Sequence, residues 1–189
     1  MKNTVIALAL MVAIVKLGLQ YGILDAPNAP SPISVNAPTE ASIKEEVKNE
    51  QDNKKVQRAI ASARQVYRRL GCRADYSAET GRISIEFGLS PRLLAGLVFV
   101  ESSCNPNAKD GRGSIGLTQV NSKVWGNKAN LHDPETNLKL GARILAGYIA
   151  RFGLVEGLHH YNGYSDVHEH VYVNKVLTAA GFAASIPKG

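Results

Sequence analysis

The hydrophobic and polar positions along the chain predict a series of helices separated by glycine and proline. Apolar residues recur at helical spacing over residues 56–70, and Gly71 follows as a stop signal. Ser90-Pro91 pairs an N-cap residue with a proline suited to the first helical position, so we expect a second helix to begin there. The alternation typical of a strand is found at most over residues 82–87. The fold class is therefore expected to be mainly α.

The second half of the chain continues this helical pattern. Asp133-Pro134 is a strong helix start, and one apolar face runs from it to a stop at Gly153. Residues 154–161 predict a shorter helix, which Asn162-Gly163 ends. Residues 120–131 have no clear period and are expected to form a loop that has room for one helical turn. A short helix is predicted over residues 78–87. A last helix is predicted from the helical spacing of Val167, Val171, Asn174 and Leu177, and Gly181 ends it.

The N-terminal part of the chain differs from the rest in composition. Residues 1–24 carry an early positive charge and an apolar run, which is typical of a signal peptide or signal anchor, and they approach the ~20 residues that cross a bilayer. We favour an uncleaved anchor, because candidate cleavage-site alanines are each followed by proline. Residues 25–55 are first proline-rich and then densely charged, as in a linker, although residues 42–55 could also form a solvated helix. We expect a catalytic domain over residues 56–182, a tail over 183–189, and a location at the periplasmic face of the inner membrane, or secretion if the anchor is cleaved.

One glutamate lies where a carboxylate is poorly solvated. Glu101 continues the apolar stripe of the helix that begins at Ser90-Pro91, four residues after Leu97 and three after Val98. Burial disfavours the charged form and raises the pKa of a carboxyl group, as a general acid requires near neutral pH. The alternative is that Glu101 caps the helix or pairs with a cation. The sequence therefore makes Glu101 the candidate catalytic residue.

Charge and cysteine content narrow the possible partners and compartment. The formal net charge is +6, which suits an anionic polymer, but the arginine cluster at residues 64–73 has no interleaved aromatics and we expect no nucleic-acid partner. No spacing of ligand residues favours a metal, and we expect neither metal nor cofactor. Cys72 and Cys104 are the two cysteines. In an exported protein they should form a disulfide, whereas in the cytoplasm they would be free thiols.

Three short motifs carry a family resemblance. ESSCNPNA begins at Glu101, GSIGLTQ ends eighteen positions later at Gln119, and HYNG spans residues 160–163. In order and spacing they resemble the lytic transglycosylases of the goose-lysozyme-like, SLT-domain type, over residues 56–181. The resemblance implies a lysozyme-like helical fold with Glu101 as acid and base. It also implies substrate contacts around the glutamate, and the expected residues are Ser102, Asp110, Ser114, Gln119, Asn121, Tyr161 and Asn162.

The chain departs from the family pattern at several positions. Thr118 stands where the family commonly has methionine, which would remove a thioether from the substrate site. Asp110 stands nine positions after Glu101, where a serine is common. A second carboxylate there would allow a water-activating role, as in inverting lysozymes. Trp125 could be either a platform for sugar stacking or part of the core.

The resemblance implies action on peptidoglycan glycan strands, and with the anchor expected at residues 1–24 the protein would be a membrane-tethered monomer. The expected reaction is cleavage of the β-1,4 bond between MurNAc and GlcNAc with formation of 1,6-anhydro ends, for which one glutamate suffices. Two alternatives stay open at this point. One is a lysozyme that uses Asp110 to position water, and the other is a wall-binding or assembly module without turnover.

Overall fold

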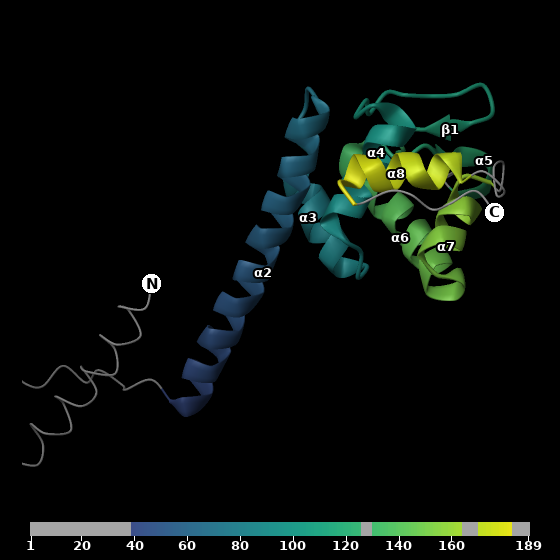
Figure 1. Cartoon of the computed structure of the whole chain (residues 1–189). Coiled ribbons are helices and arrows are strands. Elements are labelled where there is room, and N and C mark those ends of the chain that lie inside the picture. The colour runs from purple at the N-terminus through teal and green to yellow at the C-terminus, as the bar shows by residue number, and fades with distance from the viewer. Residues whose placement is uncertain (1–38, 126–129, 164–169, 183–189) are drawn as a thin grey trace, which may run out of the picture. The chain divides into compact units, whose positions relative to one another are not determined.

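The computed structural model describes residues 39–125, 130–163 and 170–182 (Figure 1). The chain divides between Ile43 and Lys44, and the fold below is that of the unit beginning at Lys44. The expected membrane segment at residues 1–24, the proline-rich part of the linker and the tail at 183–189 lie outside the described residues. Among the helices that the structure does describe, none has the length and hydropathy needed to cross a membrane.

The described elements are mostly helices, which confirms the predicted class. In chain order they are α2 (Glu40–Leu70), α3 (Ser77–Glu86), α4 (Pro91–Ser102), β1 (Ser114–Ile115), β2 (Val120–Asn121), α5 (Ser122–Trp125), α6 (Pro134–Phe152), α7 (Leu154–Tyr161) and α8 (Val171–Ala180). The two strands pair antiparallel, with Ser114 opposite Asn121.

Local sequence signals account for most of these boundaries. Ser90 is the extended N-cap of α4, and Pro91 takes the first helical position. At the start of α6, the side chain of Asp133 accepts a hydrogen bond from the backbone N–H of Thr136 at 2.9 Å. Gly153 ends α6 in a backbone conformation with φ of 82°. The predicted bounds of α7 agree with the structure; of the residues used to predict α8, Val167 lies outside the described residues.

Three parts of the chain either resolve an open alternative or differ from the prediction. The charged residues 42–55 belong to α2, and the helix is exposed there because its sequence offers almost no apolar face. Burial along α2 begins at Ala59, where the helix starts to pack on the domain. Residues 82–86 are helical within α3, so the weak alternation at residues 82–87 does not form a strand. The hairpin of β1 and β2 was not predicted, because two-residue strands are too short to show a period.

The core is built around α4. Leu94, Leu97 and Val98 are completely buried on this helix. Gly96 lets α8 come close: a Cβ at this position would lie 2.7 Å from the backbone nitrogen of Ala180. α8 therefore lies directly against α4 (Figure 1). This contact brings the start of α8 to the end of α4, where Glu101 lies.

A disulfide connects the segment after α2 to the segment after α4. Cys72 follows α2 and Cys104 follows α4, and their Cα atoms are 5.6 Å apart. The predicted pairing is therefore confirmed. Ser103 and Cys104 both have positive φ, so α4 ends abruptly at Ser102, one residue after Glu101. The bond fixes this helix end relative to α2.

Candidate functional site

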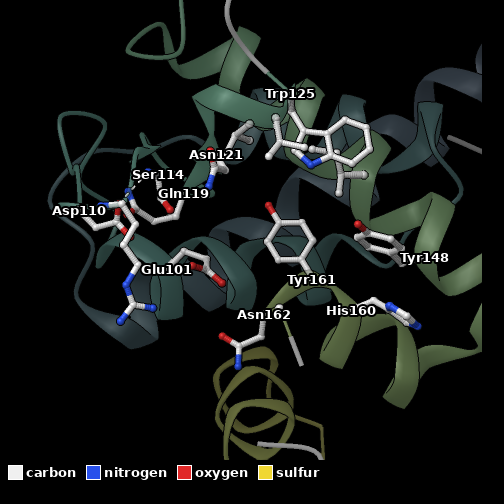
Figure 2. A pocket seen from close by; sticks show the side chains of 15 residues that line it. Glu101, Asp110, Ser114, Gln119, Asn121, Trp125, Tyr148, His160, Tyr161 and Asn162 are labelled. Carbon is white, nitrogen blue, oxygen red and sulfur yellow. Dashed lines mark hydrogen bonds between the residues drawn. The ribbon is translucent and has the colours of Figure 1, made fainter. Parts of the chain in front are cut away.

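A cleft of about 510 Å³ opens beside the end of α4. Its walls come from α4, the β1–β2 hairpin, α5, α6 and α7. In Figure 2 the side chains of Asp110, Ser114 and Gln119 lie on one side of the cleft and those of Trp125, Tyr148 and His160 on the other. Glu101 and Tyr161 lie between them. The cleft therefore presents a polar wall, an aromatic wall and a carboxyl group in the middle.

Glu101 has the environment of a general acid. It occupies the last turn of α4 and is half-buried, with its carboxyl group facing the cleft. Burial raises the pKa of Glu101 from 4.5 to about 7, and a hydrogen bond from Tyr172 opposes part of this rise. Protonated and ionised forms are both populated at neutral pH. The same group can therefore donate a proton and later accept one.

Tyr172 is the residue that holds the carboxyl group of Glu101. Its hydroxyl donates a hydrogen bond to Oε1 of Glu101 from the first turn of α8. This contact was not predicted, because 71 positions separate the two residues. A signal was present: Tyr172, Val173 and Val176 share the buried face of the last helix, and a buried tyrosine hydroxyl needs a partner.

Tyr161 lies beside Glu101 but holds another part of the site. Its hydroxyl donates to the backbone carbonyl of Thr118 at 2.8 Å. Burial, and then the nearby charge of Glu101, raise the pKa of the Tyr161 hydroxyl. Tyr161 therefore stays neutral and connects the end of α7 to the segment between β1 and β2. The orienting contact to the glutamate comes from Tyr172.

Gln119 is presented to the cleft in one defined orientation. Its backbone has a φ of 50°, which is uncommon for a residue other than glycine. Its side-chain nitrogen donates to the carbonyl oxygens of Ala108 at 3.2 Å and Gly116 at 2.9 Å. Both amide hydrogens are thus used within the loop. The side-chain oxygen is the atom that Gln119 can offer to an N–H group of a ligand.

A buried asparagine on α6 positions the turn between the two strands. The Oδ1 atom of Asn137 accepts from the N–H of Thr118 at 2.8 Å and from its hydroxyl at 2.7 Å. Its Nδ2 atom donates to the carbonyls of Ile115 at 2.8 Å and Leu131 at 3.0 Å. Thr118 is fully buried and does not line the cleft. The side chain that replaces the family's methionine therefore supports the turn from behind.

Asp110 builds the loop on the polar wall. Its Oδ1 atom accepts the backbone N–H groups of Arg112, Gly113 and Ser114, at 2.9, 2.8 and 2.7 Å. These hydrogen bonds, that of Ser114 first, lower the pKa of Asp110. Asp110 lines the cleft as an ionised group, with one oxygen saturated by the loop.

The other predicted substrate contacts divide into two groups. Ser114, Asn121 and Asn162 all line the cleft, and their contact with substrate stays a prediction. Ser102 does not, and this expectation is corrected. Its buried hydroxyl donates to the carbonyls of Val98 at 3.0 Å and Leu117 at 2.8 Å, because it lies on the face of α4 that packs on the loop.

The aromatic wall was largely missed from the sequence. Trp125 is 47% exposed and lines the cleft, so it is not part of the core. Ile144 and Tyr148 face the cleft from α6, and His160 stacks on Tyr148 with ring centroids 5.3 Å apart. In the sequence these α6 residues belong to one apolar helix face. The helical period does not distinguish residues that pack in the core from residues at the edge of the face that contact a ligand.

The part of the chain that holds this site is similar to known proteins. Residues 81–171 match the family model described as the Transglycosylase SLT domain. A transglycosylase of Enterobacteria phage PRD1 is 40% identical over 76 residues. That match covers 39% of this chain and 28% of the phage protein, so the chain spans little more than a quarter of this relative. Residues 81–171 contain Glu101 and all the residues that line the cleft. This part of the chain is therefore similar to the SLT transglycosylase domain.

Proposed function

We propose that the protein is a peptidoglycan lytic transglycosylase and that Glu101 is its catalytic residue. The observation that carries the proposal is a carboxyl group with a pKa of about 7, raised by burial, in a cleft within an SLT domain. The substrate is the glycan strand, cut at the β-1,4 bond between MurNAc and GlcNAc. The product carries a 1,6-anhydroMurNAc end.

One carboxyl group can serve both halves of this reaction. In the first half, protonated Glu101 gives its proton to the glycosidic oxygen, and the bond from that oxygen to C1 of MurNAc breaks. In the second half, the carboxylate takes the proton of the 6-hydroxyl of the same sugar, and O6 bonds to C1. The proton count is restored and no water is consumed. A pKa near the working pH favours both transfers.

The surrounding side chains have separate roles in this proposal. Tyr172 is a positioning residue that holds Oε1 of Glu101 and steadies the ionised form between the two transfers. Gln119 accepts a hydrogen bond from an acetamido N–H through its side-chain oxygen. Asn162 binds an acetamido group from the opposite side of the cleft. Trp125 offers its exposed ring to a sugar face.

Hydrolysis with Asp110 as water-activating base is the competing reaction. The hydrogen bonds of Oδ1 to three backbone N–H groups give Asp110 a structural role and stabilise its ionised form. A lowered pKa also makes it a weak base. We therefore favour the intramolecular attack of the 6-hydroxyl. We further propose that the domain works outside the cytoplasm, where its substrate lies and where the disulfide between Cys72 and Cys104 persists.

Mass spectrometry of the muropeptides released from purified peptidoglycan tests the proposal. The wild type should release fragments with anhydro ends, and Glu101→Gln should release none. Asp110→Asn serves as the discriminating variant, because it removes the charge while keeping an oxygen that can accept from the loop. Reducing ends that disappear in Asp110→Asn would instead establish a hydrolase. Binding to peptidoglycan without release by any of the three proteins would indicate a wall-binding module.

A further inference from the structure

A second, smaller cavity lies along α6. Its volume is about 230 Å³. It shares Trp125, Ile144 and Tyr148 with the catalytic cleft, so the two cavities adjoin. The rest of its lining comes from the next stripe of α6: Arg143, Gly147, Arg151 and Phe152. We call this cavity the α6 groove.

The α6 groove is lined by two arginines, Arg143 and Arg151, that form no ion pair with the described carboxylates. Arg151 lies over the ring of Phe152, 5.0 Å from its centroid. The two arginines are eight positions apart on one helix, which corresponds to about 12 Å. An extended peptide covers that distance in about four residues.

Gly147 lies between the two arginines, and the fold does not explain it. A Cβ at this position would contact nothing within 4 Å, and its φ is not positive. A glycine inside an exposed helix lowers helix stability by about 1 kcal/mol relative to alanine. The glycines at 141 and 157 are explained, because a Cβ there would collide with neighbouring atoms. At Gly147, the missing side chain serves to keep the floor of the groove open.

The aromatic residues around the groove stack on one another. His160 stacks on Phe152, with ring centroids 3.9 Å apart, as well as on Tyr148. Phe152 is 37% exposed and Trp125 is 47% exposed, so both large aromatic side chains are accessible to a ligand. Flat exposed rings beside guanidinium groups suit a ligand with a carboxylate-bearing peptide backbone.

We propose that the α6 groove binds the acidic stem peptide attached to the glycan strand that lies in the cleft. This inference rests on the proposed function and names a second recognition element for its substrate. Carboxylates of the peptide pair with Arg143 and Arg151, and the peptide backbone lies over Gly147. The protein would then prefer strands that carry peptides to strands that have lost them. Because the groove and the cleft adjoin, one strand can make both contacts.

Binding to the inactive Glu101→Gln protein tests this separately from catalysis. The probes are two soluble glycan fragments of equal length, one with stem peptides and one stripped by an amidase, titrated calorimetrically. The peptide-bearing fragment should bind about tenfold more tightly. Adding Arg143→Gln and Arg151→Gln together should remove that difference, and so should Gly147→Leu, which fills the groove with a better helix former. The affinity for the stripped fragment should stay the same in both variants.

A control with the same charge change separates the groove from general attraction. Arg58→Gln with Arg68→Gln removes two exposed positive charges from α2, outside the cleft and the groove. This pair should keep the preference for the peptide-bearing fragment. The inference is overturned by equal affinity for both fragments, by an equal loss in the control, or by an equal loss of stripped-fragment binding. Absence of anhydro products from the wild type would refute the proposed function and leave this binding result to decide the groove.

Discussion

The raised pKa of Glu101 makes a quantitative prediction about folding stability. The pKa rises from 4.5 to about 7 because the carboxyl group is buried. Each pH unit between the two values changes the free energy of unfolding by about 1.4 kcal/mol. The folded state binds this proton more tightly than the unfolded state. Stability from the protonated group is therefore complete below pH 4.5, is lost as the pH rises to 7, and is constant above that value.

Glu101→Gln should remove this loss. Glutamine has the same shape and keeps an oxygen that can accept from Tyr172, but it never becomes charged. Relative to wild type, the variant should become more stable by about 3 kcal/mol between pH 4 and pH 8. Urea unfolding of both proteins at half-unit pH steps, with the disulfide intact, measures the difference. Water that reaches the ionised carboxylate through the cleft makes this difference smaller without changing its sign.

The matched control is Glu135→Gln, which changes an exposed carboxyl at the start of α6. Its stability relative to wild type should change by less than about 1 kcal/mol over the same pH range. Parallel stability curves for wild type and Glu101→Gln from pH 4 to pH 8 would refute the argument. They would mean that Glu101 is solvated in the folded protein and has no raised pKa with which to act as an acid.

Three further changes should give distinct results. Tyr172→Phe removes the hydrogen bond that lowers the pKa of Glu101, so the alkaline limb of the pH–rate profile should move up by about one pH unit; an unmoved limb would contradict the contact. Asn137→Leu leaves several buried groups of the hairpin turn without partners and should lower the free energy of unfolding by at least about 3 kcal/mol in urea titrations. Replacing Cys72 and Cys104 together by serine should lower it by about 3 to 4 kcal/mol, from a sequence separation of 32 residues, and an unchanged urea midpoint would count against the bond.

Local signals in the sequence determined the helices and the candidate acid. Ser90-Pro91 and Asp133-Pro134 fix helix starts within one turn, because capping and proline geometry act on immediate neighbours. The helical period also placed Glu101 on the apolar face of its helix, and its burial followed. The expected export of the protein predicted that the two cysteines would pair. It did not predict the geometry of the cleft beside them.

Only the tertiary structure decided what surrounds the acid. The contact from Tyr172 arises because Gly96 lets α8 lie against α4, and no local pattern specifies which helices meet. In the same way, packing turned Ser102 away from the cleft, and the hairpin loop engaged one oxygen of Asp110. Helix signals act over a few residues, so the sequence reveals them directly. Side-chain partners distant along the chain depend on how whole helices pack, and this follows from the sum of many weak contacts.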